Sequence, residues 1–164
     1  MHRFMPVALD SLQFWINRGK IDPARPITLK SLYEAGCIRS AKKSGIHLSD
    51  RGLSFLQSKN LSIKVQSASP AAVEAVEALG GSVECVYLSQ REISAALRPE
   101  QFVIMPTQKQ HPTDWKDLRH YLSAEHRGYL APKEGETVES VVATVMRQAR
   151  MQDKRKKNTR NSRK

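Results

Sequence analysis

The sequence LSIKVQSASPAAVEAVEALGGSVECVYL, residues 61–88, has the pattern of a strand, a capped helix, a glycine turn and a second strand. Its two ends, LSIKV and SVECVYL, are short apolar segments typical of strands, and the apolar residues between them have helical spacing. Ser69 followed by Pro70 is typical of a helix N-cap and first helical position, and Gly80-Gly81 suits the helix end. Two strands joined by so short a helix are expected to lie parallel, with a right-handed crossover.

This crossover contains no group that suggests catalysis. Gly80-Gly81 lies at a helix C-terminus, whereas phosphate-binding glycine loops lie between a strand and a helix N-terminus. His47, Ser49 and Asp50 are crowded on one turn, which is not the arrangement of a catalytic triad. We therefore expect no catalytic residue, and we expect the crossover to act as a scaffold for what surrounds it.

The chain is strongly basic, and its charge is unevenly distributed. Its 164 residues include 27 Lys and Arg against 16 Asp and Glu, a formal net charge of +11. Residues 147–164 hold nine of these basic residues and one acidic residue, so this tail carries +8 and the rest of the chain +3. Such an excess predicts a polyanionic partner or an anionic surface.

Cysteine and histidine usage argues against a disulfide scaffold and against a metal site. Cys37 and Cys85 are too few for a disulfide framework, and they indicate a reducing compartment. His111, His120 and His126 match no metal-ligand spacing. The sequence predicts no metal, no cofactor and no small-molecule substrate. It also predicts no membrane partner, because its apolar runs are too short for a membrane span.

We expect two short helices before the crossover. The first is capped by Asp10 or Ser11 and ends at Gly19. The second is capped by Thr28 and ends at Gly36. The prolines between them favour an extended connector.

A short strand, GIHL, and a tight turn at residues 50–52 come next. Leu53, Phe55 and Leu56 follow the turn and are expected to pack in the core. On the first helix, Trp15 is expected in the core rather than on a stacking surface.

The predicted fold class is α/β, with a small mixed or parallel sheet and short crossover helices in an irregular β-β-α arrangement. We expect a globular core at residues 1–90 and an irregular extension with short helices at 91–136. Residues 137–164 are expected to form an amphipathic helix and a basic disordered tail, because valines have helical spacing up to Val145 and the pattern is lost from Lys154.

Several motifs, taken together and in order, resemble the large-subunit ribosomal protein fifteen family. They are Arg18-Gly19-Lys20-Ile21-Asp22 at a helix exit, Ala35-Gly36 at the next helix end, the turn from Gly45 to Gly52, and Ser69 through Gly81. The turn departs from the family's Gly-x-x-Leu-Gly-x-Gly pattern at Asp50. The likeness covers roughly residues 6–88, and the extension with ALRPEQF and HRGYL resembles the mitochondrial branch, in particular its fungal members.

The resemblance implies a structural component of the large ribosomal subunit, not an enzyme, with large-subunit rRNA and neighbouring ribosomal proteins as partners. It also implies a mitochondrial location, in the matrix and its ribosome, although MHRFMPVALD has no features of an import signal. Family members normally carry, before the equivalent of Met1, a Gly-, Arg- and Lys-rich segment that threads into rRNA. That segment is absent here, so either the sequence is truncated or the chain has lost this anchor. We favour truncation, which would also have removed any import signal.

The predicted RNA-binding residues are basic side chains that would neutralise phosphates without reading base sequence. They flank the two N-terminal helices, surround the glycine turns, where the backbone can approach a phosphate, and continue in the tail. They are Arg18, Lys20, Arg25 and Lys30, then Arg39, Lys42, Lys43 and Arg51, then Lys154, Arg155, Lys156, Lys157 and Arg160. The tail has almost no aromatic residues, so base stacking is not expected there as a main binding mode.

Other interpretations stay open at this point. Each of these cations is also compatible with ordinary solvated surface. The helix at residues 137–150 suits a non-ribosomal interaction module that binds an acidic partner or a membrane surface. A small α/β nucleotide-binding enzyme is disfavoured, because it needs a glycine-rich turn between strand and helix and SASPAA contains no glycine.

Overall fold

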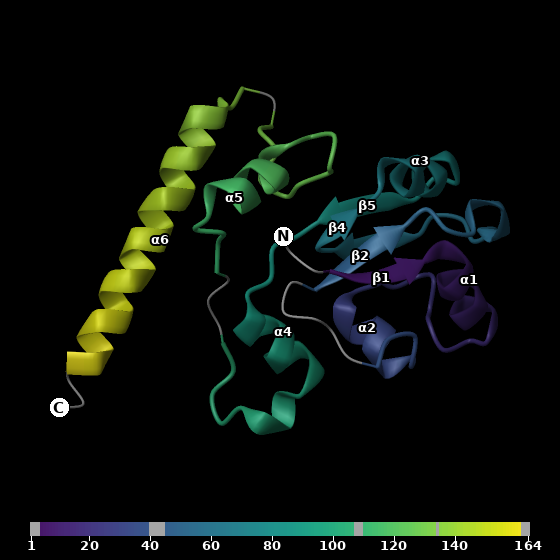
Figure 1. Ribbon diagram of the computed structural model, residues 1–164, viewed down its shortest axis with the longest axis horizontal. Coiled ribbons are helices and arrows are strands. Elements are labelled where there is room, and N and C mark those ends of the chain that lie inside the picture. Colours follow the sequence, from purple (N-terminus) through teal and green to yellow (C-terminus); the bar gives the residue numbers. More distant parts are fainter. Residues whose placement is uncertain (1–3, 40–44, 107–109, 134, 162–164) are drawn as a thin grey trace.

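The computed structural model describes residues 4–39, 45–106, 110–133 and 135–161, the stretch 152–161 by its backbone alone. It confirms the α/β class (Figure 1). The strands are β1 (Met5–Ala8), β2 (Ile46–Ser49), β3 (Ser62–Val65), β4 (Ser67–Ala68) and β5 (Ser82–Cys85). The helices are α1 (Leu9–Asn17), α2 (Leu29–Glu34), α3 (Pro70–Ala78), α4 (Gln90–Leu97), α5 (Trp115–Leu122) and α6 (Val138–Asn161), with 3-10 turns η1 (Leu53–Phe55) and η2 (Pro99–Gln101).

The central crossover has the predicted order of strand, helix and parallel strand. β3 and β5 pair in parallel, with Ser62 opposite Ser82, and α3 joins them. The Ser69 hydroxyl oxygen accepts a hydrogen bond from a first-turn N–H of α3, and Pro70 is the first helical residue. Gly80 has a φ of +77°, the left-handed conformation that lets the chain leave the helix and enter β5.

A second parallel sheet, in the order β1-β2-β4, lies beside the crossover. The chain passes from β3 to β4 through one buried residue, Gln66. Its side-chain Oε1 accepts a hydrogen bond from the Ile46 N–H at 2.9 Å, and its carbonyl accepts one from the Tyr121 hydroxyl at 3.0 Å. The sequence predicts one small sheet, and the structure has two, because β4 pairs with β2 while β3 pairs with β5.

The core lies between the strands and the helices that cover them. In Figure 1, α3 lies on one side of the strands and α1 and α2 lie on the other. The side chains that meet there include Leu12, Leu32, Leu48, Ile63 and Val76, each of which is at most 2% exposed. Burial of such aliphatic side chains stabilises the fold by about 1.5–3 kcal/mol each.

The helix starts agree with the prediction at α2 and differ at α1. Thr28 caps α2 through its hydroxyl oxygen, as predicted. α1 has no side-chain cap, so the predicted cap by Asp10 or Ser11 is wrong. The reason is that the N–H of its first residue, Leu9, donates to the Arg51 carbonyl at 3.0 Å, so a distant turn supplies an acceptor.

The C-terminal extension packs through a second, smaller hydrophobic cluster. Leu118 of α5 and Val145 of α6 are buried in it. The loop after α5 is bonded to the edge of β5: the Cys85 N–H donates to the Arg127 carbonyl at 2.8 Å, and the Tyr129 N–H donates to the Cys85 carbonyl at 3.0 Å. The short helices predicted within residues 91–136 are present as α4 and α5, and α4 ends before Pro99.

Two further contacts hold this loop in place. The Arg127 guanidinium donates to both carboxylate oxygens of Glu77 on α3, at 2.7 and 2.8 Å. A Cβ atom on Gly128 would overlap the backbone of Tyr121, so only glycine fits there. The sequence predicts an irregular extension here but gives no sign that it adds a bridge to β5.

α6 is the longest helix of the described residues and runs at an angle to the rest of the molecule (Figure 1). Its N-terminal half contacts α5, and its basic C-terminal half extends beyond that contact. The division of the chain into three regions and the behaviour of the tail stay predictions. Nowhere in the described part of the chain does a helix combine the length and apolar character needed to cross a membrane.

Candidate nucleic-acid interface

The predicted RNA-binding residues fall into three groups in the structure. Residues on or beside α1 and α2 are fully described, and they are Arg18, Lys20, Arg25, Lys30, Arg39 and Arg51. Two, Lys42 and Lys43, lie outside the described residues. The tail residues Lys154, Arg155, Lys156, Lys157 and Arg160 lie on α6, where only the backbone is described.

Arg18 and Lys20 lie at the C-terminal end of α1 and are exposed. Gly19 between them has a φ of +67°, the left-handed conformation that ends the helix and turns the chain. The Arg18 guanidinium carbon lies 4.9 Å from the ring centre of Phe14, which is a cation–π contact. Among the described residues, no carboxylate lies within 4.0 Å of either cation.

Arg25 and Lys30 each have an acidic neighbour. The Arg25 Nε lies 3.4 Å from Asp22, and the Lys30 Nζ lies 3.7 Å from Glu34. Both pairs are largely exposed, and exposed pairs contribute about 0–1 kcal/mol each. Such weak pairing leaves both cations able to exchange their carboxylate for a phosphate.

Arg51 lies at the opposite end of α1 from Arg18. Its Nε lies 4.0 Å from Asp10, in the first turn of α1. Gly52 fixes this approach, because its φ is +81° and a Cβ there would lie 2.5 Å from the Asp10 side chain. Since a helix rises 1.5 Å per residue, the two arginines flank about 12 Å of the helix.

Arg39 is exposed beyond the end of α2. No carboxylate of the described residues lies within 4.0 Å of it. Lys64, by contrast, forms a cross-strand ion pair, with its Nζ 2.9 Å from the Glu84 Oε2 on the neighbouring strand. Of the predicted cations in the globular half, the structure therefore places the six described ones on or beside α1 and α2 and at the turn at residues 50–52.

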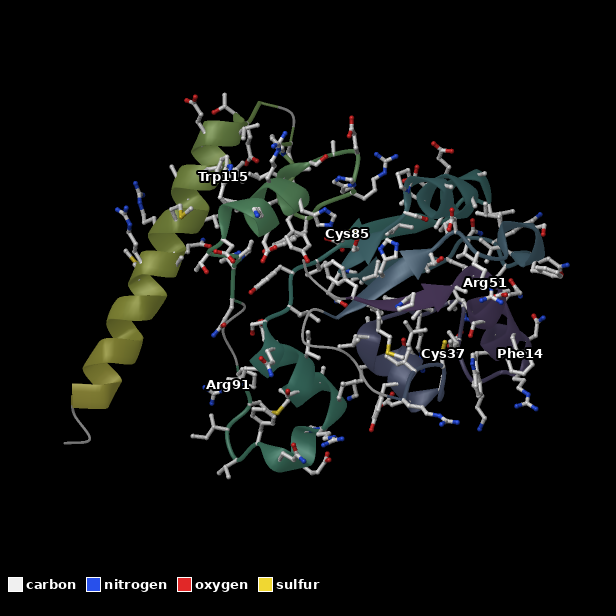
Figure 2. The ribbon with its side chains drawn as sticks, viewed as in Figure 1. Phe14, Cys37, Arg51, Cys85, Arg91 and Trp115 are labelled. Carbon is white, nitrogen blue, oxygen red and sulfur yellow. The ribbon has the colours of Figure 1, made fainter. Side chains whose placement is uncertain are left out.

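A pocket of about 350 Å³ runs along α1 between its two ends. Asp10, Gln13, Phe14 and Asn17 line it from α1, at the i, i+3, i+4 and i+7 positions of one helix face, and Phe55 and Gln57 line it from η1 and the residues after it. Figure 2 shows Phe14 at the outer edge of the molecule, near Arg51 and far from Trp115.

The floor of this pocket is held by Gln13, whose side chain is buried although it is polar. Its Oε1 accepts hydrogen bonds from the N–H groups of Gln57 and Ser58, both at 3.0 Å. Its Nε2 donates to the Asn17 Oδ1 at 2.7 Å. These bonds fix the chain after η1 against α1, so the pocket is part of the folded scaffold.

Sequence reasoning missed the aromatic side chains of this pocket. Leu53 and Phe55 were expected in the core, but they are 40% and 64% exposed, and only Leu56 is buried. The 3-10 turn at η1 turns the two side chains outward. Phe14 is 50% exposed, because it lies on a different face of α1 from Leu12, whose side chain is buried in the core. The signal was present in the sequence: Phe14 shares its helix face with polar residues.

Burial shifts the pKa values of several ionisable groups in the described interior. Burial raises the pKa of the Cys85 thiol to about 11, so this thiol stays protonated at neutral pH. Burial also lowers the pKa values of His47 and His120, and the His47 Nδ1 lies 3.0 Å from the Ser67 hydroxyl oxygen. Over the part of the chain that the structure describes, no group of three or more His, Cys, Asp or Glu is placed to hold a metal ion.

Comparison with known proteins identifies similar sequences. Residues 6–84 match a family model for ribosomal proteins. The description of this model names the proteins 50S-L15, 50S-L18e and 60S-L27a. The "Large ribosomal subunit protein uL15m" of Schizosaccharomyces pombe is 34% identical over 125 residues, which is 76% of this chain and 48% of that protein. The uL15m protein of Danio rerio is 31% identical over 134 residues, covering 79% of this chain and 45% of its own length.

Similarity to a bacterial relative is shorter. The "Large ribosomal subunit protein uL15" of Methylobacterium radiotolerans is 43% identical over 81 residues, 49% of this chain. Matches that cover three quarters of the chain, as with the uL15m proteins, must include part of the extension after residue 88. The chain spans about half the length of the curated relatives it matches.

Proposed function

Because the chain belongs to the uL15 family of large-subunit ribosomal proteins, we propose that it is a structural component of a mitochondrial large ribosomal subunit. In this proposal it binds large-subunit rRNA mainly through phosphate contacts and adjoins neighbouring ribosomal proteins. The family is one of ribosomal proteins rather than enzymes, in agreement with the prediction of a non-enzymatic chain.

The observation that carries the proposed RNA contact is the set of exposed cations around α1 and α2. Arg18, Lys20 and Arg39 have no carboxylate within 4.0 Å among the described residues, and Arg25, Lys30 and Arg51 have only weak, exposed pairs. Cations in this state can neutralise phosphates and release counterions, which is the main source of sequence-independent RNA affinity. The helices that carry them pack on the core, which fixes the backbone positions from which the cations extend.

The basic half of α6 is a second source of affinity in this proposal. α6 contacts the rest of the molecule through its N-terminal half, in the cluster with Leu118 and Val145. This packing counts against the interaction-module alternative, because the apolar face of the helix is already covered there by α5. The part of α6 beyond Met151 carries most of the tail charge.

The mitochondrial location is supported by the uL15m relatives, which match the extension as well as the core. The fungal assignment stays a prediction, because a fungal and a fish relative are similarly identical to the chain.

Co-sedimentation with large ribosomal subunits at increasing salt tests the proposal. We expect the protein to sediment with the subunit at low salt and to be released progressively as salt rises, because phosphate contacts are screened. A protein that stays in the soluble fraction at low salt would overturn the proposed function.

A further inference from the structure

We propose that the pocket along α1 binds one unpaired nucleobase of the rRNA, stacked against Phe14 and Phe55, with the flanking phosphates held by Arg18 and Arg51. This inference rests on the proposed function, because it specifies how the same surface binds RNA. The exposed cations account for phosphate binding at this surface, and the pocket adds a contact to a base.

The first observation is the exposure of two aromatic rings at one pocket. Phe14 is 50% exposed and Phe55 is 64% exposed, and they reach the pocket from α1 and from η1. Exposed aromatic side chains beside a polar pocket suit a ligand with a flat, apolar face and polar edges. Unstacked bases of single-stranded RNA are recognised in this way, by stacking on aromatic side chains and by hydrogen bonds to their edges.

The second observation is the polar lining. The side-chain amides of Asn17 and Gln57 and the carboxylate of Asp10 lie around the two rings. Base edges present both hydrogen-bond donors and acceptors, so a mixed set of amides and one carboxylate suits them. The volume of about 350 Å³ is at the lower end of the range for ligand pockets, which suits a single base.

The third observation is the distribution of charge. Asp10 makes the pocket itself unfavourable for a phosphate, because its carboxylate is negatively charged. Its Oδ2 lies 4.0 Å from the Arg51 Nε, and its Oδ1 accepts a hydrogen bond from the Ser11 N–H. The cations lie at the two ends of the pocket, with Arg18 over the Phe14 ring at 4.9 Å. A nucleotide chain matches this order, because its charge lies in the phosphates on either side of an uncharged base.

The pocket is also held in shape before any ligand binds. The buried Gln13 side chain bonds the backbone of Gln57 and Ser58 to α1, and Gly52 lets the preceding turn approach Asp10 closely. A site held in this way loses little freedom on binding, which favours affinity.

The test compares two chains of about ten nucleotides, one with bases and one without. One is a single-stranded RNA, and the other is an abasic ribose-phosphate chain of the same length and charge. Affinity for the full chain of the protein is measured by fluorescence anisotropy at several salt concentrations. The variants are Phe14→Ala, Phe55→Ala and the conservative Phe14→Trp, and Trp115→Ala serves as the control because Trp115 is a similarly exposed aromatic residue on α5.

We expect Phe14→Ala and Phe55→Ala each to weaken binding of the base-bearing RNA by about 5- to 100-fold and to leave the abasic chain unaffected. Phe14→Trp should retain affinity, and Trp115→Ala should bind as the wild type does. Equal losses for both RNAs, or no loss for either, would overturn the base-binding pocket while salt-dependent binding still supports the proposed function. Failure of the wild type to bind either RNA at low salt would overturn both.

Discussion

The hydroxyl of Tyr121 donates a hydrogen bond of 3.0 Å to the main-chain carbonyl of Gln66, 55 residues earlier in the chain. Gln66 is the residue at which the chain passes from one sheet to the other, and Tyr121 belongs to α5 in the extension. Both residues are buried. One hydrogen bond therefore connects the extension to the point where the two sheets meet.

Removing this hydroxyl is expected to destabilise the whole protein. Tyr121→Phe leaves the Gln66 carbonyl buried without this donor, and we expect a loss of about 1–3 kcal/mol in the free energy of unfolding. Urea unfolding followed by circular dichroism measures it. Tyr33→Phe is a matched control, because Tyr33 is only partly buried and lies on α2. Equal stability of the Tyr121→Phe variant and the wild type would contradict the role of this bond.

Gly128 is expected to be intolerant of any side chain. A Cβ atom there would overlap the backbone of Tyr121, so Gly128→Ala must move the loop off the edge of β5. We expect a loss of more than about 2 kcal/mol in unfolding free energy. Gly135→Ala is the comparison, because nothing lies within 4 Å of a Cβ there and only its left-handed backbone is strained, at about 1–2 kcal/mol. Equal stability of the two variants would contradict the clash between a Cβ at residue 128 and the Tyr121 backbone.

The ion pair between Glu77 and Arg127 is expected to contribute little and to depend on pH. The hydrogen bonds from Arg127 lower the pKa of the Glu77 carboxyl, so the pair stabilises the fold above the ordinary pKa of glutamate. This contribution is lost as pH falls through the lowered value and Glu77 becomes protonated. Because both side chains are partly exposed, Glu77→Gln should cost no more than about 1 kcal/mol at pH 7.

Thermal unfolding of Glu77→Gln and the wild type across the acidic range checks this prediction. The difference in midpoint between the two proteins should shrink as pH falls. A difference that stays constant down to low pH would show that the carboxylate charge is not what matters.

Alkaline pH is expected to weaken the fold through Cys85. Burial raises the pKa of this thiol to about 11, above its value in the unfolded chain, so the folded state binds the proton more tightly. Stability is therefore full below about pH 8.5 and falls as pH rises toward 11, by up to ~3 kcal/mol. Urea unfolding at several pH values should show a steeper decline for the wild type than for Cys85→Ala. Parallel curves for the two proteins would show that ionisation of Cys85 does not cause the loss of stability at alkaline pH.

The sequence was enough to predict the crossover, because its signals are local. Ser69, Pro70 and Gly80 mark the two ends of α3, and alternating apolar residues mark β3 and β5. The division into two sheets was not predictable in this way, since it follows from β4 pairing with β2 while β3 pairs with β5, and these strands are not adjacent in the chain.

The candidate interface was predictable in its charges and not in its aromatic residues. Exposed Arg and Lys beside glycine turns can be recognised in a sequence, and the structure places Arg18, Lys20 and Arg51 at the two ends of α1. Phe55 resembles a core residue in the sequence. Its exposure follows from the geometry of η1 and from the bonds made by Gln13, neither of which has a local signature.

The salt dependence of rRNA binding tests whether the exposed cations around α1 and α2 bind rRNA phosphates. The slope of log K against log salt becomes shallower by about 0.7–0.9 for each phosphate that the protein no longer neutralises. We predict that the triple variant Arg18→Ala, Lys20→Ala, Arg39→Ala flattens the slope by about 2–3 relative to the wild type. Arg91→Ala, which removes an exposed cation on α4 away from α1, should leave the slope unchanged (Figure 2). An unchanged slope in the triple variant would contradict the claim that these residues bind rRNA phosphates.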